Sequence, residues 1–154
     1  MAIHRGWQAH PNLWAFIMVL AVGARTAPGR EGFAGLPLCQ LQPGMVCRGD
    51  VLVPEVLSGL ALRSIRLDDT KFLVAVAEEA SRRAQGLMCL GSLGDLNGML
   101  FMFPDEGSSD FWMKDTLIPL DIAFFDSRAV SWTDFEMERC KVPECPSYRP
   151  SGLY

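Results

Sequence analysis

The chain has 154 residues and a mass of 17.0 kDa, the size of one domain, and its hydrophobic share of 49% is enough to build a core. Its formal net charge is −4, whereas proteins that bind the phosphate backbone of nucleic acids need a basic face. These values predict a single globular domain and argue against nucleic acid as a partner.

An apolar segment lies near the N-terminus. Residues 13–24 read LWAFIMVLAVGA, follow His4 and Arg5, and end in small residues, which is the layout of a secretory signal peptide. The segment is shorter than the roughly 20 apolar residues that a membrane span needs. We therefore predict that residues 1–24 are a signal peptide, with an uncleaved signal anchor or an N-terminal core helix as alternatives. The protein is then exported to the periplasm, the cell envelope or the extracellular space, and a membrane is a partner only through this segment if it stays uncleaved.

Residues 25–60 are rich in proline and glycine and show no sustained hydrophobic period, so we predict a linker or a loosely packed arm. Residues 62–77 follow with two strand-like runs around a turn, which predicts a β-hairpin. Residues 78–85 then carry acids in the first turn and bases in the last, and Gly86 stands after the cap. This pattern predicts one short helix whose charges stabilise the helix itself.

The rest of the chain predicts strands. Residues 98–103 are entirely apolar and predict a fully buried strand, and further strands are expected at 111–114, 120–125 and 129–135. Many short strands with a single helix predict an all-β fold, a compact β-sandwich or a small barrel.

Charged residues are set into an aromatic and aliphatic run at residues 111–125, FWMKDTLIPLDIAFF. Pro119 cannot donate a ladder hydrogen bond, so a bend, a bulge or a strand start is expected there. In the strand that follows, the face that carries Asp121 is apolar, as is the opposite face. We therefore expect the Asp121 carboxyl group to be partly buried and hydrogen-bonded, paired or protonated, with Lys114 as the nearest candidate cation in the sequence.

Five short motifs in order carry a family resemblance: GLM at 86–88, GMLFMF at 98–103, FWMK at 111–114, IPLDIAF at 118–124 and CPSYRPSG at 145–152. Together they resemble the domain of unknown function 192 family, from about residue 62 to the end. The resemblance implies a compact β-sandwich and no established activity.

The resemblance further implies a closing strand beyond the position of Tyr154. We therefore expect a domain over residues 61–154 that lacks its last strand, as in a truncated or frameshifted product, and that has an unpaired sheet edge. Two positions differ from the family pattern. Asp115 stands where members carry Asn after the Lys, and Cys89 stands where an aromatic residue is usual.

The five cysteines predict disulfides if the chain is exported. Cys140 and Cys145 are close enough to close a small loop, and Cys39 with Cys47 is a possible second bridge. Cys89 then remains as the odd thiol, which we expect to be buried and inert. A zinc site is a weaker alternative, because it needs two ligands beyond the first pair. We predict no metal and no cofactor.

The candidate ligand-binding residues are Trp112, Lys114, Asp115, Asp121, Tyr148 and Arg149. An indole beside charged groups can stack on a sugar or another small molecule while the charges bind its polar groups. Two alternatives are that Lys114 and Asp121 form a purely structural pair, or that Asp121 and Asp115 act as acid and base on a glycosidic bond.

His4 and His10, the only histidines, lie in the predicted signal segment, so no Ser-His-Asp or Cys-His arrangement is left after its removal. Enzymatic activity is therefore the less favoured hypothesis. We expect an exported module of the cell envelope, binding or accessory, with a small molecule or a carbohydrate as its partner. A carbohydrate-acting hydrolase and a purely structural secreted domain are the alternatives.

Overall fold

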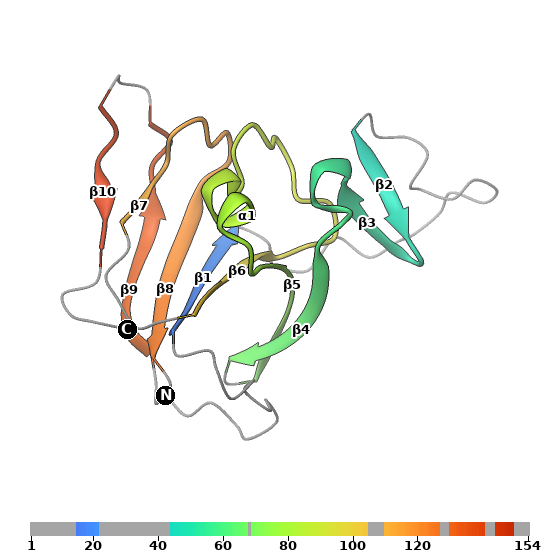
Figure 1. Ribbon diagram of the computed structural model, residues 1–154, viewed down its shortest axis with the longest axis horizontal. Helices are drawn as coiled ribbons and strands as arrows, with labels where there is room; N and C mark the ends of the chain where they lie inside the picture. Colours follow the sequence, from blue (N-terminus) through green and yellow to red (C-terminus); the bar gives the residue numbers. More distant parts are fainter. Residues whose placement is uncertain are drawn as a thin grey trace.

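The computed structural model describes residues 15–21, 44–67, 69–104, 110–126, 130–140 and 144–149. Within these ranges the chain consists mainly of strands in three sheets, with one short α-helix (Figure 1). The predicted all-β class with one short helix is confirmed, and the described strands do not close into a barrel. No helix among the described residues is long and apolar enough to cross a membrane.

The main sheet has six strands in the order β4 (Ala61–Leu67), β5 (Thr70–Ala77), β6 (Gly98–Phe103), β1 (Ala15–Ala21), β8 (Leu120–Asp126) and β9 (Val130–Met137). The two smaller sheets each have two strands, β2 (Met45–Arg48) with β3 (Val51–Pro54), and β7 (Phe111–Trp112) with β10 (Ser147–Tyr148).

The hairpin predicted for residues 62–77 is present as the antiparallel pair β4 and β5. β5 and β6, in contrast, run parallel, from the pair Val74/Gly98 to the pair Ala77/Phe101. Parallel neighbours need a crossover connection, and α1 (Ala80–Gln85) lies in that connection (Figure 1). The helix stops at Gly86, which has a φ of +52°. The parallel pair was not expected from the sequence.

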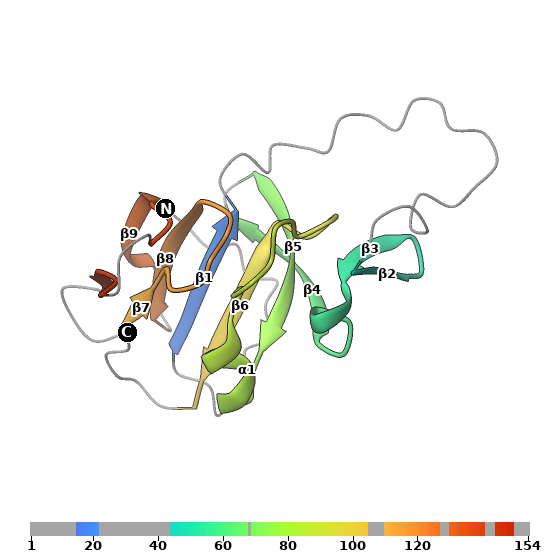
Figure 2. The same ribbon diagram turned by 90° about the horizontal axis from the view of Figure 1, so that it is seen from above.

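Strand β1 lies inside the segment that we predicted to be a signal peptide. It pairs antiparallel with β6 through residues 15–20 and with β8 through residues 15–21, and Figures 1 and 2 show it between these two strands. Residues 15–21 thus form a strand, not the core helix of the alternative interpretation. Whether residues 1–24 also direct export stays a prediction.

Residues 44–60, the described part of the predicted linker or loosely packed arm, contain two strands and a 3-10 turn. Gly49, with a φ of +62°, lies in the turn between β2 and β3, and β3 leads into a 3-10 turn, η2 (Glu55–Leu57). Val53 and Leu57 belong to the main core, with exposed fractions of 0% and 2%. The sequence did not predict these two strands, because four residues are too few to show a hydrophobic period. The remaining part of the predicted arm, residues 25–43, lies outside the described residues.

The main sheet has apolar clusters on alternate positions of its strands. The larger cluster contains Leu120, Ile122 and Phe124 of β8, and the smaller contains Phe125, with Ala123 packed against it. This agrees with the predicted division of β8 into two apolar faces. β8 also begins directly after Pro119, as expected.

Candidate functional site

A pocket of about 380 Å³ opens beside α1 and β7. It is lined by residues of α1 and the following turn, of β6 and of the segment from 110 to 120, together with the end of β9: Arg83, Ala84, Gln85, Gly86, Leu87, Met88, Phe101, Phe103, Asp110, Phe111, Trp112, Met113, Thr116, Leu120 and Met137. Its volume lies within the range of small-molecule sites, roughly 300–1,000 Å³.

Aromatic rings hold the inner wall of the pocket in a fixed arrangement. The ring of Phe111 packs edge-to-face on Phe101 with centroids 5.1 Å apart, and edge-to-face on Phe124 at 5.9 Å. Such pairs stabilise beyond the area that they bury. Met113 and Leu120 are buried beside them, at 1% and 4% exposure. The wall is therefore apolar and preformed.

Arg83 attaches the helical side of the pocket to the sheet. Its guanidinium donates hydrogen bonds to the carbonyl oxygens of Met102, at 3.0 Å, and of Glu78, and it lies 4.9 Å from the ring centroid of Phe103. These contacts engage the charged head of Arg83, so we assign it to positioning the wall.

Trp112 is the most exposed large apolar residue of the lining. The residue is 53% exposed although it is an aromatic residue in a strand, and the Nζ atom of Lys114 lies 5.4 Å from its ring centroid. Lys114 itself is exposed and does not line the pocket. An ammonium over an indole is a cation–π arrangement, which holds the ring at one edge of the pocket.

The segment that carries Tyr148 and Arg149 lies at the same edge. Tyr148 pairs with Phe111 through β10 and β7, and it is half-buried against the main core. The guanidinium of Arg149 lies 3.0 Å from the carboxylate of Asp110, which lines the pocket. Both predicted residues are therefore next to the pocket, although neither lines it.

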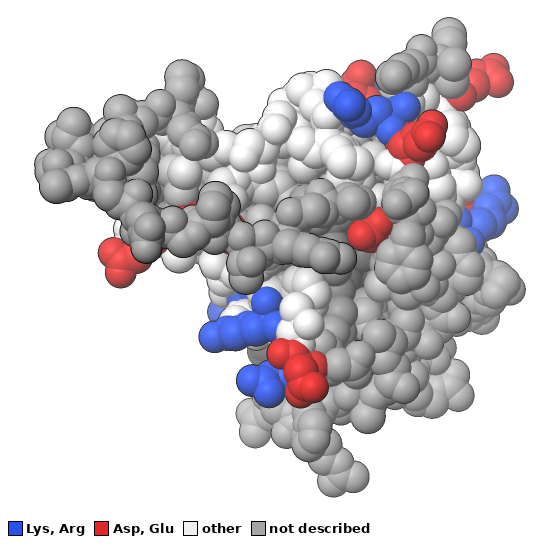
Figure 3. Space-filling model, turned by 180° about the vertical axis from the view of Figure 1, so that it is seen from behind, with Lys and Arg blue, Asp and Glu red and all other residues white. Residues whose placement is uncertain are grey.

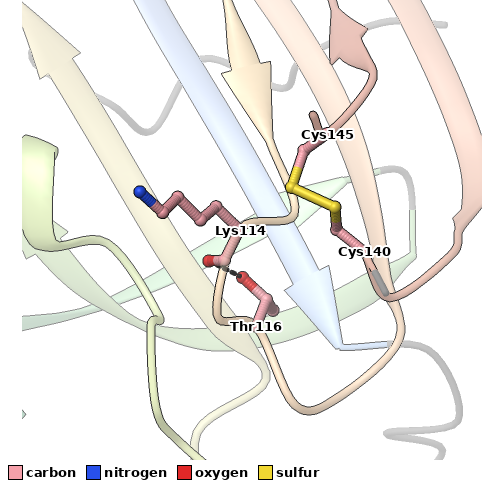
Figure 4. Close-up of a disulfide and its surroundings, with 4 residues drawn as sticks. All are labelled: Lys114, Thr116, Cys140 and Cys145. Carbon is pink, nitrogen blue, oxygen red and sulfur yellow. Dashed lines mark hydrogen bonds between the residues drawn. A yellow bond between two sulfur atoms is a disulfide. The ribbon is translucent and has the colours of Figure 1, made fainter. Parts of the chain in front are cut away.

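Asp115 belongs to a turn and not to the pocket. It is exposed with a φ of +52°, and its carbonyl oxygen accepts a hydrogen bond from the N–H of Cys89 at 2.8 Å. The hydroxyl of Thr116 closes the same turn by donating to the carbonyl of Lys114 at 3.2 Å (Figure 4). The tolerance of aspartate for positive φ accounts for this residue at this position.

The expectation of a buried Cys89 is wrong. Cys89 is a free, exposed cysteine with a φ of +61°. It follows the end of α1, where the chain turns sharply, and this local geometry leaves its side chain in solvent. A sequence pattern that reports only apolar neighbours could not show that turn.

Asp121 lies in β8 and is half-buried, as predicted. A β-bulge accompanies it, because Leu120 pairs with Met137 whereas Ile122 pairs with Asp134. No ion pair joins Asp121 to Lys114 in the part of the chain that the structure describes, where Lys114 lies over Trp112 instead. Neither Asp121 nor Asp115 is part of the pocket lining.

Cys140 and Cys145 form a disulfide with a Cα–Cα distance of 5.5 Å, the pairing predicted from the sequence. Figure 4 shows this bridge beside the turn that carries Lys114 and Thr116, with the Lys114 side chain extending away from it. The second predicted bridge, between Cys39 and Cys47, stays a prediction because Cys39 lies outside the described residues. Among those residues no three His, Cys, Asp or Glu side chains gather to hold a metal ion.

Several pocket residues were not predicted from the sequence, chiefly Gln85, Phe101 and Asp110. The sequence signal for Phe101 and Phe103 was their spacing of two within a strand, which places both on one face. The signal for Asp110 was its position directly before Phe111 and Trp112. Only the tertiary arrangement shows that these residues meet α1.

Comparison with protein families gives a match. The model of the domain of unknown function 192 family, described as an uncharacterized ACR, matches residues 63–154. Comparisons with curated proteins and with solved structures gave no match. The matched region contains the whole pocket and all strands from β5 onward. Because the match covers more than half of the sequence, the chain belongs to the domain of unknown function 192 family.

Proposed function

We propose that this protein is a binding or accessory module of the cell envelope and that its pocket holds a small molecule or a carbohydrate. The observation that carries the proposal is the position of Trp112, whose half-exposed indole forms one edge of a preformed apolar pocket of about 380 Å³. An aromatic surface that is open to solvent and fixed by its neighbours is ready to stack on a ring of the ligand.

The polar groups of the pocket suit a ligand with hydroxyl groups. Gln85 and Asp110 are lining residues that bring hydrogen-bonding side chains to a wall that is otherwise mainly apolar. A sugar ring matches such a surface, because one of its faces is apolar and its edge carries hydroxyls. Figure 3 shows the face behind the one seen in Figure 1, where the described Lys and Arg side chains lie next to Asp and Glu, with no large field of one sign among them.

Export is supported by the disulfide between Cys140 and Cys145, because disulfides persist in oxidising compartments. The hydrolase alternative gains no support from the pocket. A glycosidase places its two carboxylates on either side of one bond, about 5–10 Å apart. Asp115 and Asp121 both lie outside the lining.

The experiment is thermal unfolding of the full chain with a panel of neutral and acidic oligosaccharides. A ligand at a hundred times its Kd stabilises the folded state by about 2.7 kcal/mol. We expect Trp112→Ala to abolish the shift and Leu117→Ala to retain it. Leu117 is the matched control because its exposure, 51%, is close to that of Trp112 and it does not line the pocket.

Each other outcome points to a different function. Equal shifts in the two variants would place the ligand outside the pocket. No shift with any oligosaccharide would favour the structural secreted domain. Hydrolysis of an oligosaccharide that is lost in a folded Asp121→Asn variant would favour the hydrolase.

A further inference from the structure

The central strand of the main sheet comes from outside the family domain. β1 ends at Ala21 and β2 begins at Met45, so twenty-three residues separate β1 from the next strand. The family match begins at residue 63, whereas β6 and β8, the two neighbours of β1, lie inside it. A segment that the family region lacks therefore completes its sheet.

β1 alone joins the two halves of the main sheet. In the order of the six described strands, β6 bonds to β1 on one side and β8 bonds to β1 on the other (Figures 1 and 2). If β1 were absent, two rows of backbone N–H and C=O groups would face each other across one strand width, about 10 Å between β6 and β8. We call this gap the β6/β8 slot.

The slot defines the chemistry of its occupant. Met99 and Phe101 of β6 and Ile122 and Phe124 of β8 are at most 4% exposed and belong to the larger apolar cluster, so this face of the slot is apolar and buried. A charged strand would lose its hydration there, and a proline would remove a ladder hydrogen bond. Only an extended, uncharged, proline-free segment that runs antiparallel to both neighbours fits. Residues 15–21, AFIMVLA, have these properties.

We propose that the β6/β8 slot is a binding site for one extended apolar peptide strand and that residues 15–21 of this chain are its ligand. The mode of binding is β-augmentation, in which main-chain hydrogen bonds to two edges supply affinity and the apolar surroundings supply selectivity. The pocket beside Trp112 is a separate feature, and its ligand is not required for strand binding.

The connection between β1 and β2 gives the strand the reach of a tethered ligand. Twenty-three extended residues span up to about 80 Å, and tethering supplies an effective concentration in the millimolar range for short linkers. Residues 13–24, which contain β1, have the layout of an export segment. They cannot lie in a membrane or an export channel and pair with β6 and β8 at the same time. The slot is therefore filled only after the segment leaves the membrane or channel, in a chain from which it is not cleaved.

The test begins with the full folded chain carrying a specific protease site between residues 25 and 35. After cleavage, the N-terminal fragment should co-elute with the rest of the chain in size-exclusion chromatography. A fluorescent synthetic peptide of residues 13–24 should then exchange into the cleaved protein. The same peptide with Val19→Pro should bind at least about tenfold more weakly, because proline breaks the ladder within the strand.

Three results would overturn the proposal. The fragment could leave while the rest of the chain keeps its strand structure, which would show that the slot needs no occupant. The rest of the chain could unfold as soon as the chain is cut, which would show that the strand does not bind without its covalent link. Both peptides could bind equally, which would show unspecific apolar association. Hydrogen exchange on the uncut Val19→Pro chain gives a further readout, with faster exchange expected at β6 and β8 amides than in the β2–β3 hairpin.

Discussion

The carboxylate of Asp110 lies 3.0 Å from the guanidinium of Arg149, and this ion pair joins the segment after β10 to the rim of the pocket. The side chains are 45% and 66% exposed, respectively. Solvent therefore screens the attraction, and the pair positions the rim more than it stabilises the fold.

We expect Arg149→Ala to lower the free energy of unfolding by less than about 1 kcal/mol, because exposed ion pairs contribute between zero and that amount. Urea unfolding at low and high salt measures the effect, which should shrink as salt rises. Asp110→Asn is the matched variant, and its cost should not add fully to that of Arg149→Ala, since both remove one interaction. A loss of several kcal/mol in either variant would contradict the assignment of the pair to the rim.

Removal of the disulfide should lower the free energy of unfolding by more than the loss of this ion pair. The double variant Cys140→Ser with Cys145→Ser frees a loop whose ends are five positions apart, and loop-closure entropy predicts a loss of about 2 kcal/mol. Urea unfolding with and without reductant measures this loss. The variant should no longer respond to reduction of this bridge, and an unchanged midpoint would show that the bridge leaves the unfolded chain unconstrained.

Cys89 supplies the control for the disulfide. Its thiol is free and exposed, so Cys89→Ser should change stability by no more than about 0.5 kcal/mol. Mass spectrometry of the native, unreduced protein should show alkylation at Cys89 and none at Cys140 or Cys145. Alkylation of the latter two without reductant would contradict the disulfide.

Local patterns in the sequence predicted local structure well. The β4–β5 hairpin, the short helix and the buried strand β6 follow from periodicity and cap residues within a few positions of each other. The parallel pairing of β5 with β6 and the place of β1 between β6 and β8 were not predicted. They depend on partners far apart in the sequence, and a short apolar run has no period that names its neighbour.

The same division holds for the candidate site. Trp112 was predicted as a ligand-binding residue because an indole next to charges in an apolar run suggests a surface for a ligand. The structure places it at the pocket edge. Lys114 and Asp121 were expected to pair because they are near in sequence. In the structure Lys114 precedes the turn at Asp115, whereas Asp121 lies in β8, and the two side chains form no ion pair among the described residues. Arg83 was not predicted as a lining residue, because its place in the pocket depends on the packing of α1 against β6.

Gly94 lies where the loop before β6 approaches β3 closely. A Cβ at Gly94 would lie 2.5 Å from the carbonyl oxygen of Leu52, and the φ of +63° also disfavours any other residue. We expect Gly94→Ala to lower the free energy of unfolding by about 2 kcal/mol. Gly91→Ala is the matched control, because nothing lies within 4 Å of its Cβ position. Equal unfolding midpoints for the two variants would show that the loop moves away from Leu52 without cost.

Asn97 fixes the beginning of β6 to β5 by two reciprocal hydrogen bonds. The N–H of Leu73 donates to Asn97 Oδ1 at 2.7 Å, and the N–H of Asn97 donates to the Leu73 carbonyl at 2.7 Å. Asn97→Ala leaves the half-buried Leu73 N–H without its acceptor, which costs about 1–3 kcal/mol. Asn97→Asp keeps an acceptor oxygen, so urea unfolding should show a smaller loss for this variant. Hydrogen exchange should show a selective rise at the Leu73 amide in Asn97→Ala. Equal losses in both variants, with no change at that amide, would mean that Asn97 contributes through packing and not through this bond.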